Sequence, residues 1–302
     1  MRKRLKIVLF VLFGLAVVWL LGDLIYSSIV AYRIKKWEAS VERDEEGVEK
    51  GCREYTIGSG ETAVLFVHGI NDSPRCYHKM APALAEEGFT CRVMRMPGFA
   101  EPTGHYARAT KEQWLAAIKR EIESLRQDHR RVAVVAHSLG GAVTIAHLLE
   151  NPEAVDAVVL LAPAVEVSNR RSPLLSTRAW HAIARHALLF TKVTNSPFPN
   201  DCHDAAEGEY PGRTPFMPVA VADQTLQLID SNLGRAAELK ITLMMVLAKD
   251  DQVVDWRAAE QFYRQASSED KVIQFMEDSG HAIPVDHGWE DLTHEIAGFL
   301  RD

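Results

Sequence analysis

A serine, two adjacent aspartates and a histidine each follow an apolar run that predicts a strand. Ser138 follows residues 131–137, Asp250 and Asp251 follow residues 239–247, and His281 follows residues 271–275. A serine hydroxyl is a poor nucleophile until a base takes its proton and an acid holds that base in one tautomer. These residue types therefore indicate nucleophilic catalysis, provided that folding brings the three loops together.

The stretch around Ser138 predicts a strand, a sharp turn and a helix. Residues 131–137 are mostly apolar and β-branched, as in a buried parallel strand, and residues 139–149 have a helical pattern. This is the context of a nucleophile elbow, in which a tight turn lifts the serine hydroxyl clear of the sheet. The turn requires small residues two positions to either side, here Ala136 and Gly140, although glycine is usual at the first. The flanking strand and helix disfavour an ordinary serine in a glycine-containing turn.

Two residues qualify as the acid. Asp250 and Asp251 both stand in a loop that directly follows a predicted strand, where an acidic side chain should project. Asp255 lies a few residues further on and is expected to cap the next helix instead.

Among the twelve histidines, His281 has the best position for the base. It stands in the loop between the last predicted strand and the closing helix. His287 is the nearest rival, but it lies further from the strand end. His137 is expected to point away from Ser138, because the two are chain neighbours.

The oxyanion that forms during acyl transfer needs two preorganised N–H donors. The backbone amide of Leu139, directly after the serine, is expected to supply one. Ile70 is the best position for the other, because it follows the predicted strand 62–67 and Gly69 lets the backbone turn sharply there. His68 is expected to brace this loop rather than to act in catalysis.

Strands that alternate with helices predict an α/β fold, with a mostly parallel sheet covered by helices on both faces. The predicted strands are residues 52–57, 62–67, 90–94, 131–137, 155–161, 239–247 and 271–275, and the predicted helices are residues 77–87, 111–126, 139–149, 258–265 and 288–300. The interval 164–221 does not fit this alternation. We interpret it as an inserted cap over the carboxyl ends of the strands, with a lid-like role. A surface excursion that contains an ordinary buried helix is the alternative.

The N-terminal segment has the composition of a membrane anchor. An uncharged run extends from residue 7 to residue 21, and apolar residues continue to residue 32. A helix of about 20 to 25 residues spans a bilayer, so contact with the lipid bilayer is predicted for residues 7–32. Asp23 is expected near the far interface, where a charge costs less, and the candidate interfacial aromatics are Trp19, Tyr26, Tyr32 and Trp37. A cleaved signal peptide is the competing interpretation, but no convincing Ala-x-Ala site follows the run.

Basic residues favour one orientation in the membrane. Arg2, Lys3, Arg4 and Lys6 precede the apolar run, and Arg33, Lys35 and Lys36 follow it. The small excess of basic residues before the run predicts a single-pass protein with a cytoplasmic N-terminus. Its catalytic domain would then lie on the periplasmic or extracellular side, where cysteines could oxidise. The predicted organisation is an anchor over residues 1–36, a linker and first strand over 37–61, and an α/β domain over 62–302 that carries the cap.

Composition argues against several other classes of protein. The 302 residues are 47% hydrophobic and 25% charged, which permits a large core and excludes global disorder. The net charge of −7 gives no indication of a nucleic-acid partner. Cys52, Cys76, Cys91 and Cys202 form no Cys-x-x-Cys pair, so neither a zinc nor a redox motif is supported. The predicted chemistry needs no metal or cofactor, and the sequence decides neither the disulfide state nor the oligomeric state.

Several of these motifs resemble those of the α/β-hydrolase family, and most closely its carboxylesterase and monoacylglycerol-lipase-like branch. They are His68-Gly69 with Pro74 downstream, Ala136-His137-Ser138-Leu139-Gly140-Gly141, Asp251-Gln252-Val253-Val254 and Ser279-Gly280-His281. The resemblance covers roughly residues 62–300. It implies the α/β-hydrolase fold, a triad of Ser138, His281 and Asp251, and an oxyanion hole made by the amides of Ile70 and Leu139. It also selects Asp251 over Asp250, because the acid in such enzymes stands two residues before an apolar residue. Ala136 and the cap sequence depart from the family's pattern, and the cap leaves the substrate open.

Three hypotheses about function follow. The first is a membrane-anchored serine esterase that cleaves lipid acyl esters, such as a monoacylglycerol or a lysophospholipid, through an acyl-enzyme. Cap residues that suit an acyl chain are Leu174, Leu175, Trp180, Leu188, Leu189 and Phe190, and those that could meet an anionic head group are Arg170, Arg171, Arg178 and Arg185. The second is a peptidase of the proline-iminopeptidase type, with Glu207 and Glu209 as candidates to bind a free amine, or a thioesterase. The third is a non-catalytic binding scaffold. Dehalogenase and epoxide-hydrolase chemistry is disfavoured, because both use an aspartate where Ser138 stands.

Overall fold

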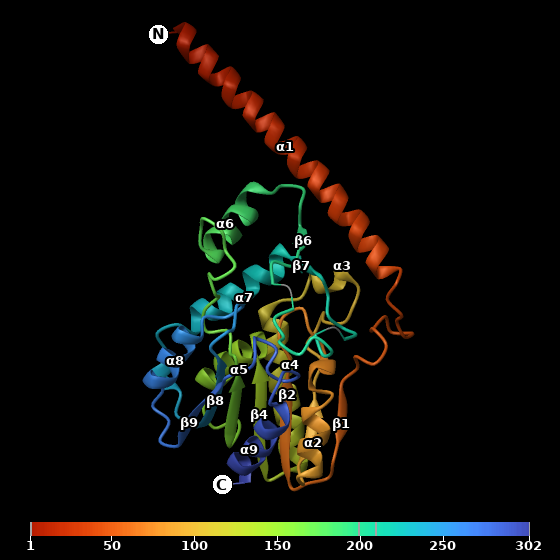
Figure 1. Cartoon of the computed structure of the whole chain (residues 1–302), viewed down its shortest axis with the longest axis vertical. Coiled ribbons are helices and arrows are strands. Elements are labelled where there is room, and N and C mark those ends of the chain that lie inside the picture. The colour runs from red at the N-terminus through yellow and green to blue at the C-terminus, as the bar shows by residue number, and fades with distance from the viewer. Residues whose placement is uncertain (1, 199, 209, 302) are drawn as a thin grey trace.

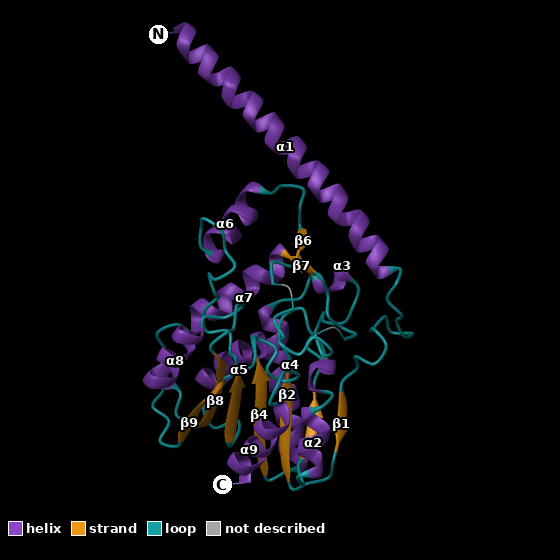
Figure 2. Cartoon of the chain, viewed as in Figure 1, coloured by secondary structure: helices purple, strands orange, loops and turns teal. Residues whose placement is uncertain are grey.

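A mostly parallel sheet forms the centre of the molecule (Figure 2). Within the residues that the computed structural model describes, 2–198, 200–208 and 210–301, seven strands form this sheet in the order β1-β3-β2-β4-β5-β8-β9. They are β1 (Tyr55–Ile57), β2 (Thr62–Val67), β3 (Thr90–Val93), β4 (Arg131–His137), β5 (Ala157–Leu161), β8 (Thr242–Ala248) and β9 (Lys271–Met276). Only β1, which pairs with β3, runs antiparallel to its neighbour.

Helices cover both faces of the sheet, as predicted. The residues buried against one face come from α4 (Lys111–Asp128), α5 (Leu139–Glu150), α7 (Val219–Asn232) and α8 (Trp256–Gln265). Those buried against the other face come from α2 (Met80–Glu86) and α9 (Trp289–Arg301). Short helical turns complete the domain: η1 (Pro74–Tyr77), α3 (Thr103–Tyr106) and η2 (Ala236–Glu238). The domain therefore has a layered α/β fold, with helices on both faces of a mostly parallel sheet.

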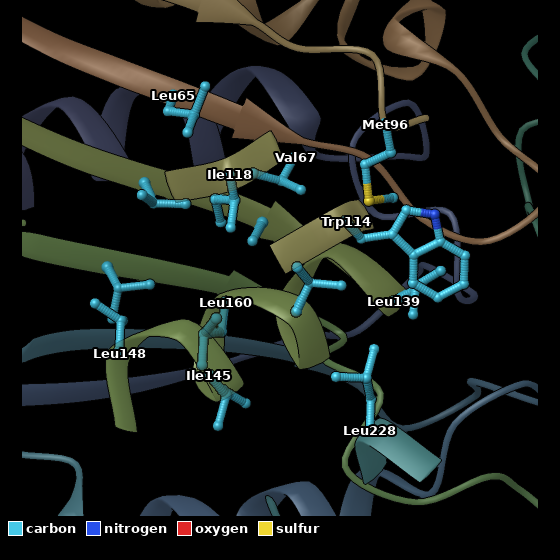
Figure 3. Close-up of a cluster of buried hydrophobic side chains, with 14 of the residues drawn as sticks. Leu65, Val67, Met96, Trp114, Ile118, Leu139, Ile145, Leu148, Leu160 and Leu228 are labelled. Carbon is cyan, nitrogen blue, oxygen red and sulfur yellow. The ribbon is translucent and has the colours of Figure 1, made fainter. Parts of the chain in front are cut away.

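Alternation along β2 shows how the sequence forms two cores from one sheet. Leu65 and Val67 pack into the cluster beneath α4 and α5, where Trp114 and Ile145 are also buried (Figure 3). Phe66, between them, points into the opposite cluster. Successive strand side chains face opposite sides, so a continuous apolar run is what a sheet covered on both faces requires.

The register places the loops that matter at one edge of the sheet. Val67 pairs with Ala136, and His137 pairs with Leu161. On the other side of β5, Leu161 pairs with Val246 of β8. Because these neighbouring strands are parallel, the chain leaves β2, β4, β5 and β8 at the same edge.

The cap lies beyond that edge and is formed by the chain segment that connects β5 to β8 (Figure 1). It contains α6 (Thr177–Ala187) and an antiparallel pair formed by β6 (Val193–Asn195) and β7 (Phe216–Pro218). Helix α7 then begins at residue 219, so the expected cap boundary at residue 221 falls inside it. No sequence pattern was assigned to α7, although its buried Val221, Leu228 and Ile229 recur at helical spacing.

The N-terminal helix α1 (Arg2–Glu38) extends well beyond the rest of the molecule (Figure 1). Its residues 3–38 are long and apolar enough to cross a membrane, with a mean hydropathy of 2.6 in the most apolar window, a property that membrane anchors share with signal sequences. Nearly all of its large apolar side chains up to Tyr32 are exposed, whereas Val30 is buried against the domain. The helix therefore has a free N-terminal part and a docked C-terminal part.

Two of the aromatics expected at a membrane interface instead contact the protein. Trp37 packs edge-on against Phe216 of β7, with ring centroids 5.8 Å apart. The indole Nε1 of Trp19 donates a hydrogen bond to the carbonyl oxygen of Ala187, at the end of α6, over 3.0 Å. Asp23 is also largely covered by the cap, with 4% of its surface exposed. The polar cap backbone beside α1 explains the contacts of Trp19 and Asp23, because it offers hydrogen-bond partners that a lipid environment lacks.

The four cysteines are free thiols. Cys52, Cys76 and Cys91 are buried. Burial raises the pKa of Cys91 to about 12, and a thiol with such a pKa stays protonated at neutral pH. These residues therefore pack as small hydrophobic side chains.

Candidate functional site

Ser138 occupies a strained turn between β4 and α5. Its backbone φ is 53° and its ψ is −118°, a conformation that residues with a side chain rarely adopt. The turn is held by a hydrogen bond of 3.0 Å from Ser138 N to the carbonyl oxygen of Leu161 in the neighbouring strand. This geometry is the nucleophile elbow that the sequence predicts.

Close backbone packing explains the small residues around the elbow. A Cβ added at Gly140 would collide with the carbonyl oxygen of Val67 and lie 2.7 Å from that of His68. A Cβ added at Gly141 would lie 2.8 Å from the Cβ of Pro163. Ala136, where glycine is usual, is fully buried, and its methyl group joins the main core cluster. The extra methyl is therefore accommodated by apolar packing.

The structure brings the predicted base and acid to Ser138. His281 Nε2 lies 2.9 Å from Ser138 Oγ, and His281 Nδ1 lies 2.7 Å from Asp251 Oδ2. The other carboxylate oxygen of Asp251 accepts hydrogen bonds from Val253 N and Val254 N, at 2.7 and 2.8 Å. Asp251 is thus fixed from both sides, and its interaction with Nδ1 leaves Nε2 facing the hydroxyl.

The rival residues lie elsewhere. Asp250 and His287 are exposed, and neither lines the cavity beside Ser138. Asp255 caps α8 by accepting hydrogen bonds from the amides of Arg257 and Ala258, as predicted.

The ring of His137 contacts the loop that carries His281 rather than the side chain of Ser138. Its Nε2 lies 2.9 Å from the carbonyl oxygen of His281, and the two rings are 4.8 Å apart. Burial, and secondarily the charge of a protonated His281, holds the pKa of His137 well below its usual value. His137 therefore stays neutral and holds the loop that carries His281.

The predicted oxyanion donors line the same cavity as Ser138. Leu139 is the first residue of α5, so its amide has no acceptor within the helix. Gly69 passes so close to the elbow that an added Cβ would lie 3.0 Å from the Cβ of Ser138. Ile70 follows directly, and its amide donates no hydrogen bond to any described protein group. Both amides are therefore available to a developing negative charge.

His68 braces this loop, as predicted. Its Nδ1 lies 3.0 Å from the carbonyl oxygen of Gly69, and its Nε2 accepts a hydrogen bond of 3.1 Å from Met96 N. This pattern requires a neutral ring with the proton on Nδ1. Complete burial lowers its pKa to about 4, which keeps the ring neutral at physiological pH.

Two buried carboxylates that the sequence did not single out join the cap to the catalytic loops. Asp201, in the cap, accepts hydrogen bonds from Gln252 N at 2.8 Å and His281 N at 3.1 Å. Asp286, in the domain, accepts from Gly280 N at 2.7 Å. It also binds the cap amides of residues 203 and 204, at 3.0 and 2.9 Å. No sequence motif marks either residue, since their partners are backbone amides distant in the chain.

A cavity of about 410 Å³ lies between the sheet edge and the cap, with Ser138 in its wall. Its lining is mainly apolar and comes largely from α6, β7, α7 and the loops after β5 and β8. It includes Val167, Trp180, Ala184, Met217, Leu226 and Val254. The described residues contain no cluster of three or more His, Cys, Asp or Glu side chains placed to hold a metal ion.

Most charged cap residues named in the sequence hypotheses have protein partners. Arg178 pairs with Glu166 and Asp230, and Arg185 pairs with Asp223. Arg171 binds Gln252 and Asp201, and Arg170 lies 3.5 Å from the carbonyl oxygen of Asp251. Glu207 pairs with Lys79 at 2.9 Å and does not line the cavity, while Glu209 lies outside the described residues. The arginines therefore brace the cap.

Fold and elbow together define an α/β hydrolase. Over residues 58–288 the chain matches the family described as serine aminopeptidase, S33, and it belongs to that family. The match begins after α1, so the helix lies outside it.

Relatives named as esterases and lipases refine the class. A carboxylesterase of Bacillus subtilis (strain 168) is 20% identical over 242 residues, which cover 80% of this chain and 92% of the relative. A thermostable monoacylglycerol lipase of Bacillus sp. (strain H-257) is 27% identical over 120 residues, 40% of this chain and 48% of the relative. Among solved structures, the monoacylglycerol lipase of Paleococcus ferrophilus has a TM-score of 0.70 at 19% identity, covering 82% of this chain and 97% of its own, which shows the same fold. The protein is a serine hydrolase of the carboxylesterase and lipase type.

Proposed function

We propose that this protein is a membrane-anchored hydrolase that cleaves lipid acyl esters through Ser138, His281 and Asp251. The observation that carries the proposal is the hydrogen-bonded series from Asp251 through His281 to Ser138, beside an apolar cavity. Each distance is short enough for proton transfer or for holding a tautomer.

The reaction would proceed in two halves. Ser138 Oγ attacks the ester carbonyl carbon while His281 Nε2 takes its proton, and Asp251 stabilises the imidazolium that forms. The amides of Ile70 and Leu139 would bind the oxyanion of the tetrahedral intermediate. This intermediate collapses to an acyl-enzyme as His281 returns the proton to the leaving alcohol. Water then attacks the acyl-enzyme with His281 again as the base, and Ser138 is regenerated.

The cavity favours an acyl chain as the part of the substrate that it binds. Its lining is mainly apolar, and burial of apolar surface contributes about 25 cal/mol for each Å². The two relatives named as monoacylglycerol lipases agree with this, and we favour a monoacylglycerol or a lysophospholipid. Arg178 and Arg185 are already paired with carboxylates in the cap, which argues for the uncharged glycerol head group of a monoacylglycerol.

The anchor would be the apolar part of α1, within residues 7–32. The basic residues before it support a cytoplasmic N-terminus, with the catalytic domain on the periplasmic or extracellular side. In this organisation, residues 1–36 form the anchor, 37–61 the linker and first strand, and 62–302 the hydrolase domain with its cap.

A fluorophosphonate probe tests the nucleophile directly. The full-length protein in detergent should be labelled, and Ser138→Ala should not be. Because Ser172 also lines the cavity, Ser172→Ala is a matched control that should keep its labelling. Labelling that persists in Ser138→Ala, or is absent from all three proteins, contradicts the proposal and in the second case favours a binding scaffold.

A substrate panel separates the alternatives that share the same three residues. We expect hydrolysis of monoacylglycerols and of p-nitrophenyl esters, with a preference for longer acyl chains up to the length that the cavity holds. Thioesters and aminoacyl anilides of matched size should be poorer substrates. Cleavage of the anilide in preference to every ester would instead support an aminopeptidase.

A further inference from the structure

One face of α1 carries polar side chains that meet the cap. Trp19, Asp23 and Ser27 recur every four residues, so they lie in one stripe along the helix. Trp19 binds the last residue of α6, and Asp23 and Ser27 bind the segment that follows it. A helix that served only as a tether would need no such stripe.

Asp23 is the centre of this contact. Its Oδ2 accepts hydrogen bonds from Leu189 N at 2.6 Å and Phe190 N at 2.8 Å, and its Oδ1 accepts from Thr191 N at 3.1 Å. The hydroxyl of Thr191 returns a bond of 3.3 Å to the carbonyl oxygen of Asp23. Three amide donors satisfy the carboxylate where it is buried, and burial without them would be strongly unfavourable.

The same contact lies where the helix would leave the bilayer. Residues 7–22 carry no charge and form a helical stretch about 24 Å long, close to the hydrocarbon thickness of roughly 30 Å. Asp23 follows directly, so the cap segment bound to it lies at the depth of the lipid head groups. The anchor and the cap thus reach the same membrane surface.

Exposed apolar side chains gather in the cap. Of the nine large apolar residues that are exposed outside α1 in the described part of the chain, six lie between residues 174 and 190. They are Leu174, Leu175, Trp180, Ile183, Leu189 and Phe190. Leu174 is 97% exposed although its backbone is left-handed, with φ at 66°, and an unfavourable conformation that displays a leucine to solvent needs a reason.

One of these six residues, which we call the cap rim, lines the cavity beside Ser138. Trp180 lines the cavity and is itself 41% exposed. Its Nε1 donates a hydrogen bond of 2.8 Å to the carbonyl oxygen of Pro173, next to Leu174. Pro173 and Trp180, which both line the cavity, therefore connect it to the exposed Leu174.

We propose that Asp23 is a positioning residue that fixes the cap to the membrane helix, so that the cap rim enters the lipid leaflet beside α1. The partner of this surface is the boundary between lipid head groups and acyl chains. Ester substrates then reach Ser138 from the membrane. This inference rests on the proposed esterase function for its kinetic test, but the contact between Asp23 and the cap can be measured without catalysis.

Hydrogen exchange tests the contact itself. The full-length protein in nanodiscs of phosphatidylcholine and phosphatidylglycerol should protect the amides of residues 189–191. Asp23→Asn and Asp23→Ala should each exchange these amides at least about tenfold faster, because the charged acceptor is lost. Ser28→Ala is the matched control, since the Ser28 hydroxyl bonds only to Leu24 within α1. Unchanged exchange in both Asp23 variants would overturn the role of Asp23, whether or not the protein is an esterase.

Kinetics then test the orientation. Asp23→Asn should raise KM for a long-chain monoacylglycerol in vesicles by about tenfold, and leave kcat/KM for soluble p-nitrophenyl butyrate within about twofold. Leu189→Ser with Phe190→Ser should act in the same way, whereas Leu233→Ser with Val272→Ser, at exposed apolar sites elsewhere, should not. Equal losses on both substrates would indicate a general structural role and overturn the membrane orientation. Absence of hydrolysis in the unaltered protein would refute the esterase function and leave the exchange result to stand alone.

Discussion

Helices α5 and α6 both border the cavity, but different interactions hold them. Ten of the twelve residues of α5 are buried, whereas α6 has no buried residue. The cap is instead attached by carboxylates that accept hydrogen bonds from backbone amides: Asp201 and Asp286 at the loops around Asp251 and His281, and Asp23 at α1. Apolar burial thus positions Ser138, while a few directed polar contacts position the cap that covers it.

This difference has a consequence for how each region responds to change. Apolar burial spreads its free energy over many contacts, so the sheet edge should respond to the volume of its side chains. A charged hydrogen bond concentrates free energy at one group, so the cap should respond to single charges. Four substitutions, or pairs of substitutions, can break or sharpen the comparison.

The largest effect is expected at the acid. Asp251→Asn should lower kcat/KM for a soluble ester by about 10⁴-fold, because the amide no longer holds His281 in the required tautomer. Asp250→Asn, at the exposed neighbouring position, should change it by less than about twofold. The measurement is steady-state hydrolysis of p-nitrophenyl butyrate. A greater loss in Asp250→Asn would show that the acid has been assigned to the wrong residue.

A pair of isoleucines compares the two helices directly. Ile145→Ala, in α5, should lower the free energy of unfolding by about 3 kcal/mol through lost burial and a residual cavity. Ile183→Ala, in α6, should change it by less than about 0.5 kcal/mol, because the side chain is already exposed. Chemical unfolding in detergent measures both. Equal destabilisation would mean that α6 is held by apolar burial after all.

Asp201 tests the polar attachment of the cap. Asp201→Asn should lower kcat by about 10- to 100-fold with a smaller effect on KM, because the amides of Gln252 and His281 lose a shared charged acceptor. Asp204→Asn is a suitable control, because the Asp204 carboxylate accepts a hydrogen bond from Ala206 N in its own loop and none from Gln252 or His281. Partial rescue of kcat by Asp201→Glu would separate positioning from general stability. If Asp201→Asn changed KM alone, the link to the catalytic loops would be refuted.

The smallest of the four effects is a pH dependence of the free energy of unfolding, which comes from His68 in the loop after β2. His68 has a pKa of about 4 in the folded protein and an ordinary value of 6.5, so the unfolded state binds more protons between these values. Its contribution to stability is complete above pH 6.5 and is lost as the pH falls towards 4. Between pH 7 and pH 5 this amounts to about 2 kcal/mol.

His68→Gln should therefore reduce the acid sensitivity of unfolding, even if it lowers stability at pH 7. The exposed His287 provides the control, and His287→Gln should leave the pH dependence unchanged. Urea unfolding at pH 5, 6 and 7 gives the free energy of unfolding at each pH, and its slope against pH is compared between the variants. Identical slopes for the unaltered protein and His68→Gln would contradict the assignment of a neutral buried ring to His68.

The sequence predicted those parts of the molecule that local pattern encodes. Periodicity located every strand of the main sheet, and β2 (Thr62–Val67) and β4 (Arg131–His137) matched to the residue. The strand–turn–helix pattern gave the elbow at Ser138, whose geometry the structure shows. Other boundaries moved by a few residues: β1 begins at residue 55 rather than 52, because the chain before it forms turns.

The parts that sequence reasoning missed depend on contacts between distant segments. Asp201 binds amides 51 and 80 residues away, and Asp23 binds amides 166 to 168 residues away. An aspartate with such partners looks like any other aspartate in the sequence. Helix α7 was missed for a different reason: a cap with irregular composition precedes it, and its helical spacing was not separated from that segment.

The carboxylates that hold the cap have one further property: their partners are mostly main-chain amides. Every residue except proline offers the same N–H group, whatever its side chain. Positions 189, 190, 203, 252 and 281 can therefore meet their acceptors without any demand on side-chain identity. Selection can thus change the exposed side chains of Leu189 and Phe190 while the cap remains attached in the same place.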